Sequence, residues 1–454
     1  MQVLRFRMAL SFSVKSMKSW LANFWLDPHP RSDKVRQVRN SVLRRPAIRL
    51  FGENHRTLNY DLWFKSCIPL WPKSSRSDKA LDRIRRLHLM YLDEQISHSA
   101  ATDWLLEEAR SSKLGQQWSS SMLFDMARTS RQIGLFAGSG GLYDKGQSAF
   151  ERELCNSDNP RKSIGLARLA IQRGDLDMAQ YFAQTLRESK LQIPVTQLIT
   201  RYVDLWSGTF FRESTRPQTD VDEQYSRLVC GQKILILGPG PMTDFAREDY
   251  GDFKIARIVF YSHSGMSAGG NDPGKTDLAY SNGVNSVRLA GLPAPVLRNF
   301  MSQFSAHTGR LGATKNGILE GRGLVSRFLP AEPILLTGGS NMAQTMLLDI
   351  LSFAPEEVFL KGITFYTGGQ PYRHGQERQI YSHISQVKPA PLGELRYRLC
   401  SDIGGHSPQE NRKLILNLWN AGRVNGDVLF EKSLSLSEGS YLRGLDSQYG
   451  VDRL

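Results

Sequence analysis

The chain has 454 residues, of which 40% are hydrophobic and 22% are charged. This length and composition are typical of a globular protein with two or three domains, and they exclude an intrinsically disordered chain. The formal net charge of +14 at pH 7 is concentrated near the N-terminus rather than spread evenly.

The first 49 residues form a basic arm, in which eleven Lys or Arg and two Asp leave a net charge of +9. Residues 8–26 (MALSFSVKSMKSWLANFWL) are too polar to span a bilayer and lack the features of a secretory signal, but they suit a membrane interface. Peripheral attachment to the inner, anionic face of the cytoplasmic membrane and a solvated arm both stay open. We expect a cytoplasmic protein, and no motif favours nucleic acid.

The cysteines are far apart in the sequence and fit neither a metal-binding pattern nor a disulfide framework. We therefore expect reduced, mostly buried thiols, a reducing compartment and no structural zinc. The four residues are Cys67, Cys155, Cys230 and Cys400.

Helical periodicity without strand alternation extends over residues 81–215, after a region (1–80) that the sequence leaves largely uninterpreted. Its clearest part is 161–190, where apolar residues recur at helical spacing on both sides of Gly174. This predicts a helical hairpin that resembles a tetratricopeptide unit. Since only one unit is recognisable, we expect a packing subdomain rather than a solenoid, with partner binding as the alternative.

An α/β domain is predicted for residues 228–430, after a polar connector and before a C-terminal tail at 431–454. Short apolar runs alternate there with helical stretches, which indicates a Rossmann-like, mostly parallel sheet. Ligands of such sheets bind at the carboxyl ends of the strands. The predicted strands are 233–238, 255–261, 276–281, 333–338 and 356–363.

Small polar residues follow most of these predicted strands. Gly238 and Gly240 let the chain approach a phosphate, but Thr243 stands where a dinucleotide fingerprint needs a third glycine, which disfavours a redox cofactor. Each of the other residues alone is more often a turn residue that caps a helix, whereas their recurrence after successive strands favours nucleotide binding. They are Ser262, Asn282, Thr337 and Ser340.

A Gly-His-Ser triplet at 405–407 opens a predicted helix. Ser407 is the expected N-cap and Glu410 its capping-box partner. Because His406 lies at the positive end of this helix, we expect a neutral imidazole that can accept a proton. The rival histidines on predicted loops are His374 and His383.

Two tyrosines, Tyr366 and Tyr372, lie on either side of a Gly-Gly-Gln-Pro turn in 362–372 (GITFYTGGQPY), directly after a predicted strand. Ordinary packing does not require two phenols in that arrangement.

Together these motifs resemble the bacterial sialyltransferases of glycosyltransferase family 42, over about residues 232–420. The shared elements are a strand ending in Gly-x-Gly-Pro, an asparagine loop two strands later, a Thr-Gly-Gly turn, the Tyr-x₅-Tyr spacing and the Gly-His-Ser helix start. The last two are the most specific.

The resemblance implies a transferase that moves sialic acid or a related nonulosonic acid from a CMP donor to a glycan or glycolipid acceptor by inverting direct displacement. In this family pattern His406 is the general base, and Tyr366 and Tyr372 donate hydrogen bonds to the departing CMP phosphate. No cofactor and no bound metal are implied. Further nucleotide contacts are implied at Gly338, Gly339 and Gly362.

The chain departs from the family pattern in its nucleotide loops. Pro239 stands where the family has Asn, Thr364 replaces an Asp, and Gly338 replaces a Ser. These changes leave open which CMP-linked acid is used, with pseudaminic acid, legionaminic acid and Kdo as alternatives. From other classes, a Rossmann-like methyltransferase or oxidoreductase and a non-catalytic nucleotide-binding scaffold also stay open.

Overall fold

A computed structural model of the chain describes most of the sequence from residue 79 onward. Within that part, no helix combines the length and the apolar character needed to cross a bilayer. The predictions for the basic arm (1–49) and for Gly338, Gly339 and Tyr372 lie outside the described residues. The described residues are 79–92, 95–111, 118–156, 162–189, 194–209, 220–240, 250–259, 261–262, 265–266, 276–282, 289, 292–310, 326–329, 334–337, 340–367, 403 and 406–450.

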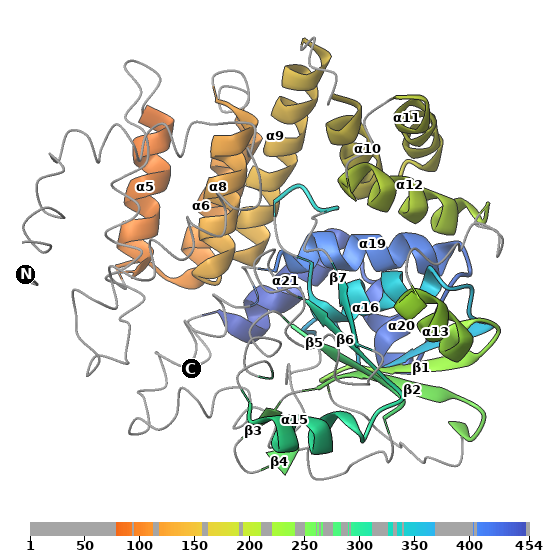
Figure 1. The fold of residues 1–454 in the computed structure, drawn as a ribbon. Helices are drawn as coiled ribbons and strands as arrows, with labels where there is room; N and C mark the ends of the chain where they lie inside the picture. Colours follow the sequence, from red (N-terminus) through yellow and green to blue (C-terminus); the bar gives the residue numbers. More distant parts are fainter. Residues whose placement is uncertain are drawn as a thin grey trace, which may run out of the picture.

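The described residues between 79 and 209 form helices, as the periodicity predicts (Figure 1). The start of α6 is capped by a short polar side chain, since Ser97 accepts a hydrogen bond from the Ala100 amide (3.2 Å). The helices are α5 (Lys79–Leu92), α6 (His98–Arg110), α8 (Ser120–Gln132), α9 (Phe136–Cys155), α10 (Lys162–Arg173), α11 (Leu176–Glu188) and α12 (Pro194–Ser207).

The predicted helical hairpin corresponds to α10 and α11, which pack against each other. Gly174 (φ +75°) makes the left-handed turn between them, and Asp175 then caps α11 by accepting from the Met178 amide at 3.1 Å. Ala179 and Ala183 are fully buried on the inner face of α11. Helix α12 packs against α11 and also contacts α19 (Pro408–Asn420), a helix of the C-terminal α/β region.

The second region is built on a seven-stranded sheet in the order β7-β6-β5-β2-β1-β8-β9, in which every described pairing is parallel. This confirms the α/β, Rossmann-like fold class. The strands are β1 (Lys233–Leu237), β2 (Lys254–Ile258), β5 (Leu278–Ser281), β6 (Ala306–Arg310), β7 (Ser326–Leu329), β8 (Glu357–Lys361) and β9 (Asn425–Gly426).

One of the five strand predictions, that for residues 333–338, is wrong. Ile334 and Leu335 are buried as expected, but residues 334–337 are irregular. The amides of Leu336 and Thr337 donate to the carboxylate of Glu410 instead of to a neighbouring strand. The structure also contains strands that were not predicted: β6, β7, β9, and a short antiparallel pair of β3 (Tyr261–Ser262) with β4 (Gly265–Met266).

A continuous apolar core joins one face of the sheet to the helical region. It includes Ile234 and Ile236 of β1, and it extends through α16 (Met342–Leu351) and α19 to α12 and α9. Figure 1 shows α19 between the sheet and α10–α12. The opposite face carries a separate cluster around α15 (Ala294–Met301), and α13 (Asp220–Val229) precedes the first strand. The helical region and the sheet are therefore packed as one body.

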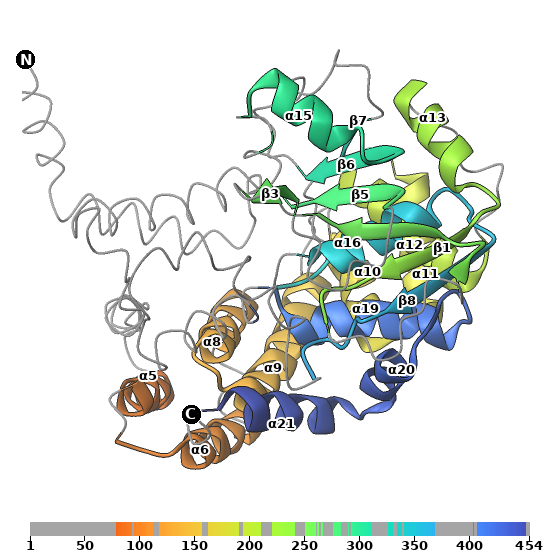
Figure 2. The same cartoon turned by 90° about the horizontal axis from the view of Figure 1, so that it is seen from below.

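Residues 428–449, most of which the sequence indicated only as a tail, form two packed helices, α20 (Val428–Ser435) and α21 (Glu438–Tyr449). The side chains of Phe430, Tyr441 and Leu445 are fully buried in the main core. Figure 2 shows α21 alongside α9. The tail prediction missed these helices because their apolar residues are interleaved with serines.

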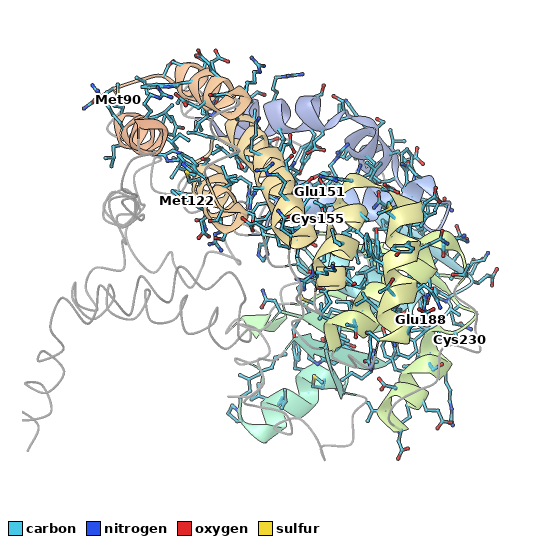
Figure 3. The ribbon with its side chains drawn as sticks, turned by 90° about the horizontal axis from the view of Figure 1, so that it is seen from above. Met90, Met122, Glu151, Cys155, Glu188 and Cys230 are labelled. Atoms are coloured by element: carbon cyan, nitrogen blue, oxygen red, sulfur yellow. The ribbon has the colours of Figure 1, made fainter. Side chains whose placement is uncertain are left out.

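The cysteine prediction is partly corrected. Cys155, at the end of α9, is exposed rather than buried. Cys230 is half-buried in the turn after α13, and the two thiols lie on well-separated elements (Figure 3). Cys67 and Cys400 lie outside the described residues.

Candidate functional site

Most of the predicted site residues that the structure describes lie at the carboxyl edge of the sheet. Because the strands are parallel, the positions directly after β1, β5 and β8 share this edge, which places Gly238, Asn282 and Gly362 there. Helices that connect parallel strands start at the same edge. Ser340, which directly precedes the N-cap of α16, and His406, which directly precedes the N-cap of α19, are thereby brought to it.

The turns after β1 and β8 are bonded to each other. The strand order reverses between these two strands, which is where ligands bind in open sheets. The Gly238 amide donates to the Lys361 carbonyl (2.8 Å), and the Gly240 amide donates to the Gly362 carbonyl (2.9 Å). A Cβ on Gly238 would lie 2.3 Å from the Gly362 oxygen, so only glycine fits. These amides join the two turns, and contact of the two glycines with a phosphate stays a prediction.

The turn after β8 has an unusual backbone. Phe365 (φ +48°) and Tyr366 (φ +71°) are consecutive left-handed residues that are not glycine, a conformation that costs on the order of 1–3 kcal/mol each. Helix α21 supports them: the Tyr441 hydroxyl donates to the Phe365 carbonyl and the Tyr449 hydroxyl to the Tyr366 carbonyl, both at 2.9 Å. Such a conformation persists only where the surrounding structure enforces it, and it is concentrated at functional sites.

Neighbouring residues add further support to this turn. The Gly362 amide donates to Asp427 Oδ2 (2.9 Å), and the Thr367 hydroxyl donates to the Thr364 carbonyl (2.7 Å). The side chain of Tyr366 is half-buried against the main core. The predicted partner of this tyrosine, Tyr372, lies beyond the described residues, so the pair itself stays a prediction.

His406 is exposed in the turn just before α19. Its amide donates to the Ile403 carbonyl (3.2 Å), and its carbonyl accepts from the Asn411 side chain. Ser407 is left-handed (φ +46°) and is the N-cap, with Pro408 as the first helical residue, as predicted. The main chain around the imidazole is therefore held while the ring faces solvent.

The predicted capping box is not formed. Ser407 makes no side-chain cap bond, and Glu410 is fully buried. Its carboxylate accepts from the Tyr143 hydroxyl of α9 (2.9 Å) and the Leu336 amide (2.7 Å). It also accepts from the amide and the hydroxyl of Thr337. A capping pattern did not reveal these partners because they lie far away in the sequence.

Arg131 of α8 completes this buried polar cluster. Its Nη2 donates to the Thr337 hydroxyl (3.3 Å), and the guanidinium is fully buried. Burial lowers the pKa of Arg131 to about 10, while the nearby carboxylate of Glu410 opposes that shift. Burial also raises the pKa of the Tyr143 phenol, so Tyr143 stays a hydrogen-bond donor at neutral pH.

The remaining predicted residues lie at separate positions along the same edge. Ser340 is buried next to Asn341, the N-cap of α16, whose amide donates to Asn411 Oδ1 at 3.0 Å. Asn282 is half-buried after β5, and Ser262 belongs to the short strand β3. Asn411 thus links the starts of α16 and α19, and with them Ser340 and His406.

Aspartates that could suggest a metal–nucleotide motif have structural roles. Asp175 caps α11, and Asp222 accepts from the buried Arg327 at 2.8 Å. Within the described ranges, no group of three or more His, Cys, Asp or Glu is arranged to hold a metal ion.

No protein-family model and no curated protein matches the chain. Among solved structures, a mutant of the Thermobaculum terrenum O-GlcNAc transferase aligns with 83% of this chain and 98% of its own length, at 8% sequence identity and a TM-score of 0.17. At that TM-score the alignment does not establish a shared fold. It therefore carries no argument about activity.

Proposed function

We propose that the protein is a glycosyltransferase that moves sialic acid or a related nonulosonic acid from a CMP donor to a glycan acceptor by direct, inverting displacement. The observation that carries this proposal is the joint placement of His406 and the strained turn at Tyr366 at the carboxyl edge of one parallel sheet. The motif resemblance gives this arrangement its chemical interpretation.

In the proposed reaction, His406 is the general base. Its exposed imidazole stands at the start of α19, where an acceptor hydroxyl can approach from solvent. Removing the hydroxyl proton as the new glycosidic bond forms is a step for which a positioned base contributes roughly 10²–10⁴ in rate. The bonds from Asn411 to the His406 and Ser407 carbonyls limit movement of the main chain that carries this base.

Tyr366 is the proposed hydrogen-bond donor to the departing phosphate. The leaving CMP gains negative charge as the bond to the sugar breaks, and a preorganised donor is worth about 2.7–4 kcal/mol by analogy with an oxyanion hole. The support of its carbonyl by Tyr449 fits that requirement, since a donor must be in place before charge develops. The second donor, Tyr372, is proposed from the resemblance alone.

Of the residues that the sequence predicts to contact the nucleotide, we keep some and reassign one. Thr337 is already engaged by Glu410 and Arg131, so we assign it to holding its own turn. The half-buried Asn282 is the described residue whose position after β5 best suits a hydrogen bond to the nucleotide.

The test is a ligand panel on the full-length protein. Melting temperature is measured with CMP, UDP, S-adenosylmethionine and NAD, each with and without EDTA, and transfer is then assayed with CMP-linked sialic, pseudaminic and legionaminic acids and Kdo. A ligand present at 100 times its dissociation constant stabilises the native state by about 2.7 kcal/mol, so we expect CMP alone to raise the melting temperature, in EDTA as well. Stabilisation by S-adenosylmethionine or NAD but not CMP would replace this proposal by one of the other classes.

A further inference from the structure

A buried polar cluster connects the helical region to the start of α19. We define the anchor cluster as Arg131, Tyr143, Thr337, Ser407 and Glu410. All five side chains are at least nine-tenths buried. A carboxylate without solvent is tolerated only where donors surround it, and here they come from α9 and from the turn before α16.

The anchor cluster lies directly behind the proposed base. Glu410 is in the first turn of α19, and the Thr337 hydroxyl lies 3.5 Å from the Ser407 hydroxyl. Ser407 itself is left-handed, so the main chain at His406 needs an external hold to keep its conformation. The cluster supplies part of that hold through the Ser407 side chain, and Asn411 supplies the rest by donating to the His406 and Ser407 carbonyls.

Helix α9 is hydrogen-bonded both to α21 and to α19. Asp446 of α21 accepts from the Phe136 amide (2.7 Å) and the Ala137 amide (3.0 Å) at the start of α9, and Tyr143 donates to Glu410 two turns later. The same helix α21 supports the Tyr366 turn through Tyr449. The pair α9–α21 therefore connects the base to the phosphate-binding tyrosine.

We infer that Tyr143, acting through Glu410, is a positioning residue for His406, so that the helical region is part of the catalytic machinery rather than only a packing layer. This inference rests on the proposed role of His406 and deepens it. Tyr143 touches neither the substrate nor the reacting atoms; it fixes the helix start on which the base is carried, with Arg131 fixing the facing turn.

The chain contains a matched control for this inference. Tyr202 of α12 is also buried, and its hydroxyl donates to the Leu414 carbonyl of α19 at 2.9 Å. Both tyrosines thus bond α19 from the helical region, but Tyr202 does so one turn beyond Glu410. A purely structural role predicts that Tyr143→Phe and Tyr202→Phe behave alike.

The experiment compares these two variants in the full-length protein. We expect Tyr143→Phe to lower kcat roughly tenfold to a hundredfold with the donor KM nearly unchanged, because misplacing a reacting group by about 1 Å has effects of this size. The NMR signal of the His406 ring, assigned with His406→Gln, should shift in Tyr143→Phe. In Tyr202→Phe both kcat and that signal should stay as in the wild type.

Equal kcat in the two variants, or a His406 signal that Tyr143→Phe leaves unmoved, would overturn the inference. Urea unfolding of both variants shows whether their stability losses match, so that a difference in kcat is not a difference in folded fraction. A wild-type protein that binds CMP but transfers no sugar would contradict the proposed function without contradicting the inference about Tyr143. The shift of the His406 NMR signal in Tyr143→Phe would then decide whether Tyr143 positions His406.

Discussion

The two ends of the candidate site are held in different ways. At the tyrosine end, neutral phenols of α21 bond the carbonyls of Phe365 and Tyr366. At the base end, a buried carboxylate, Glu410, is surrounded by amides, hydroxyls and a nearby arginine. Hydrogen bonds to a charged group contribute about 1.5–3 kcal/mol and neutral ones about 1 kcal/mol. The base end is therefore held more firmly and is more sensitive to the loss of one partner.

The largest expected effect is at the base end itself. Replacing His406→Ala should lower transfer by roughly 10²–10⁴, because the proton acceptor is lost. CMP binding should change little, since in the proposed reaction His406 acts on the acceptor and not on the nucleotide, and the CMP-dependent rise in melting temperature measures this directly. Near wild-type transfer by His406→Ala would remove the assignment, as would a full loss in either of the rival variants His374→Ala and His383→Ala.

The next largest effect is a loss of folding stability as the pH falls, and it should be larger near the base end than at the tyrosine end. Burial lowers the pKa of His88 to about 3, and the ring bonds the Ser130 hydroxyl (2.8 Å) beside Arg131 on α8. Between pH 6.5 and 3 the unfolded chain binds a proton that the folded chain does not, so stability falls as the pH falls. By pH 5 this amounts to about 2 kcal/mol.

Urea unfolding at pH 7.5 and pH 5.0 measures this loss, and His88→Gln should flatten it. His307 of β6 contributes with the same sign, because burial lowers its pKa to about 4. His307→Gln should therefore also flatten the loss measured by urea unfolding, and amide exchange then separates the two contributions. Amide exchange should show the His88 effect in α5 and α8 and leave α21 unchanged. A pH dependence that His88→Gln does not alter would contradict the assignment.

The smallest effect is at the tyrosine end. Tyr441→Phe and Tyr449→Phe each delete one neutral hydrogen bond to the left-handed turn, which should lower the free energy of unfolding by about 1 kcal/mol. We expect kcat to fall severalfold, because the turn that carries Tyr366 can then relax. Tyr181→Phe, at an exposed residue of α11, should change neither quantity. A larger loss here than in Tyr143→Phe would reverse the ranking of the two ends.

The strands that could be predicted share one physical property. β1, β2, β5 and β8 lie inside the sheet and read as apolar runs, which the sequence displays directly. β6 (AHTGR) is mostly polar and β7 (SRFL) has only two apolar residues, so neither forms an apolar run, and their hydrogen bonds come from neighbouring strands. The apolar run at 333–338 reads as a strand but is not one, because the amides of Leu336 and Thr337 donate to one distant side chain, Glu410, and not to a neighbouring strand.

The site shows the same division. The start of α19 could be predicted because Ser407 and Pro408 are a local signal. The partners of Glu410 could not, because Tyr143 and Thr337 come from other parts of the chain and no short-range rule connects them. The left-handed turn at Phe365 also had no sequence signal, since bulky residues rarely adopt that conformation.

Helix α21 also bears on the order in which the protein acquires its site during synthesis. The ribosome makes the chain from its N-terminus, so every other described element exists before Tyr441, Asp446 and Tyr449 emerge. Until then the start of α9 lacks its cap and the turn after β8 lacks its support. A nascent chain can thus contain every strand of the sheet while both ends of the candidate site lack these contacts, which form only once α21 has docked.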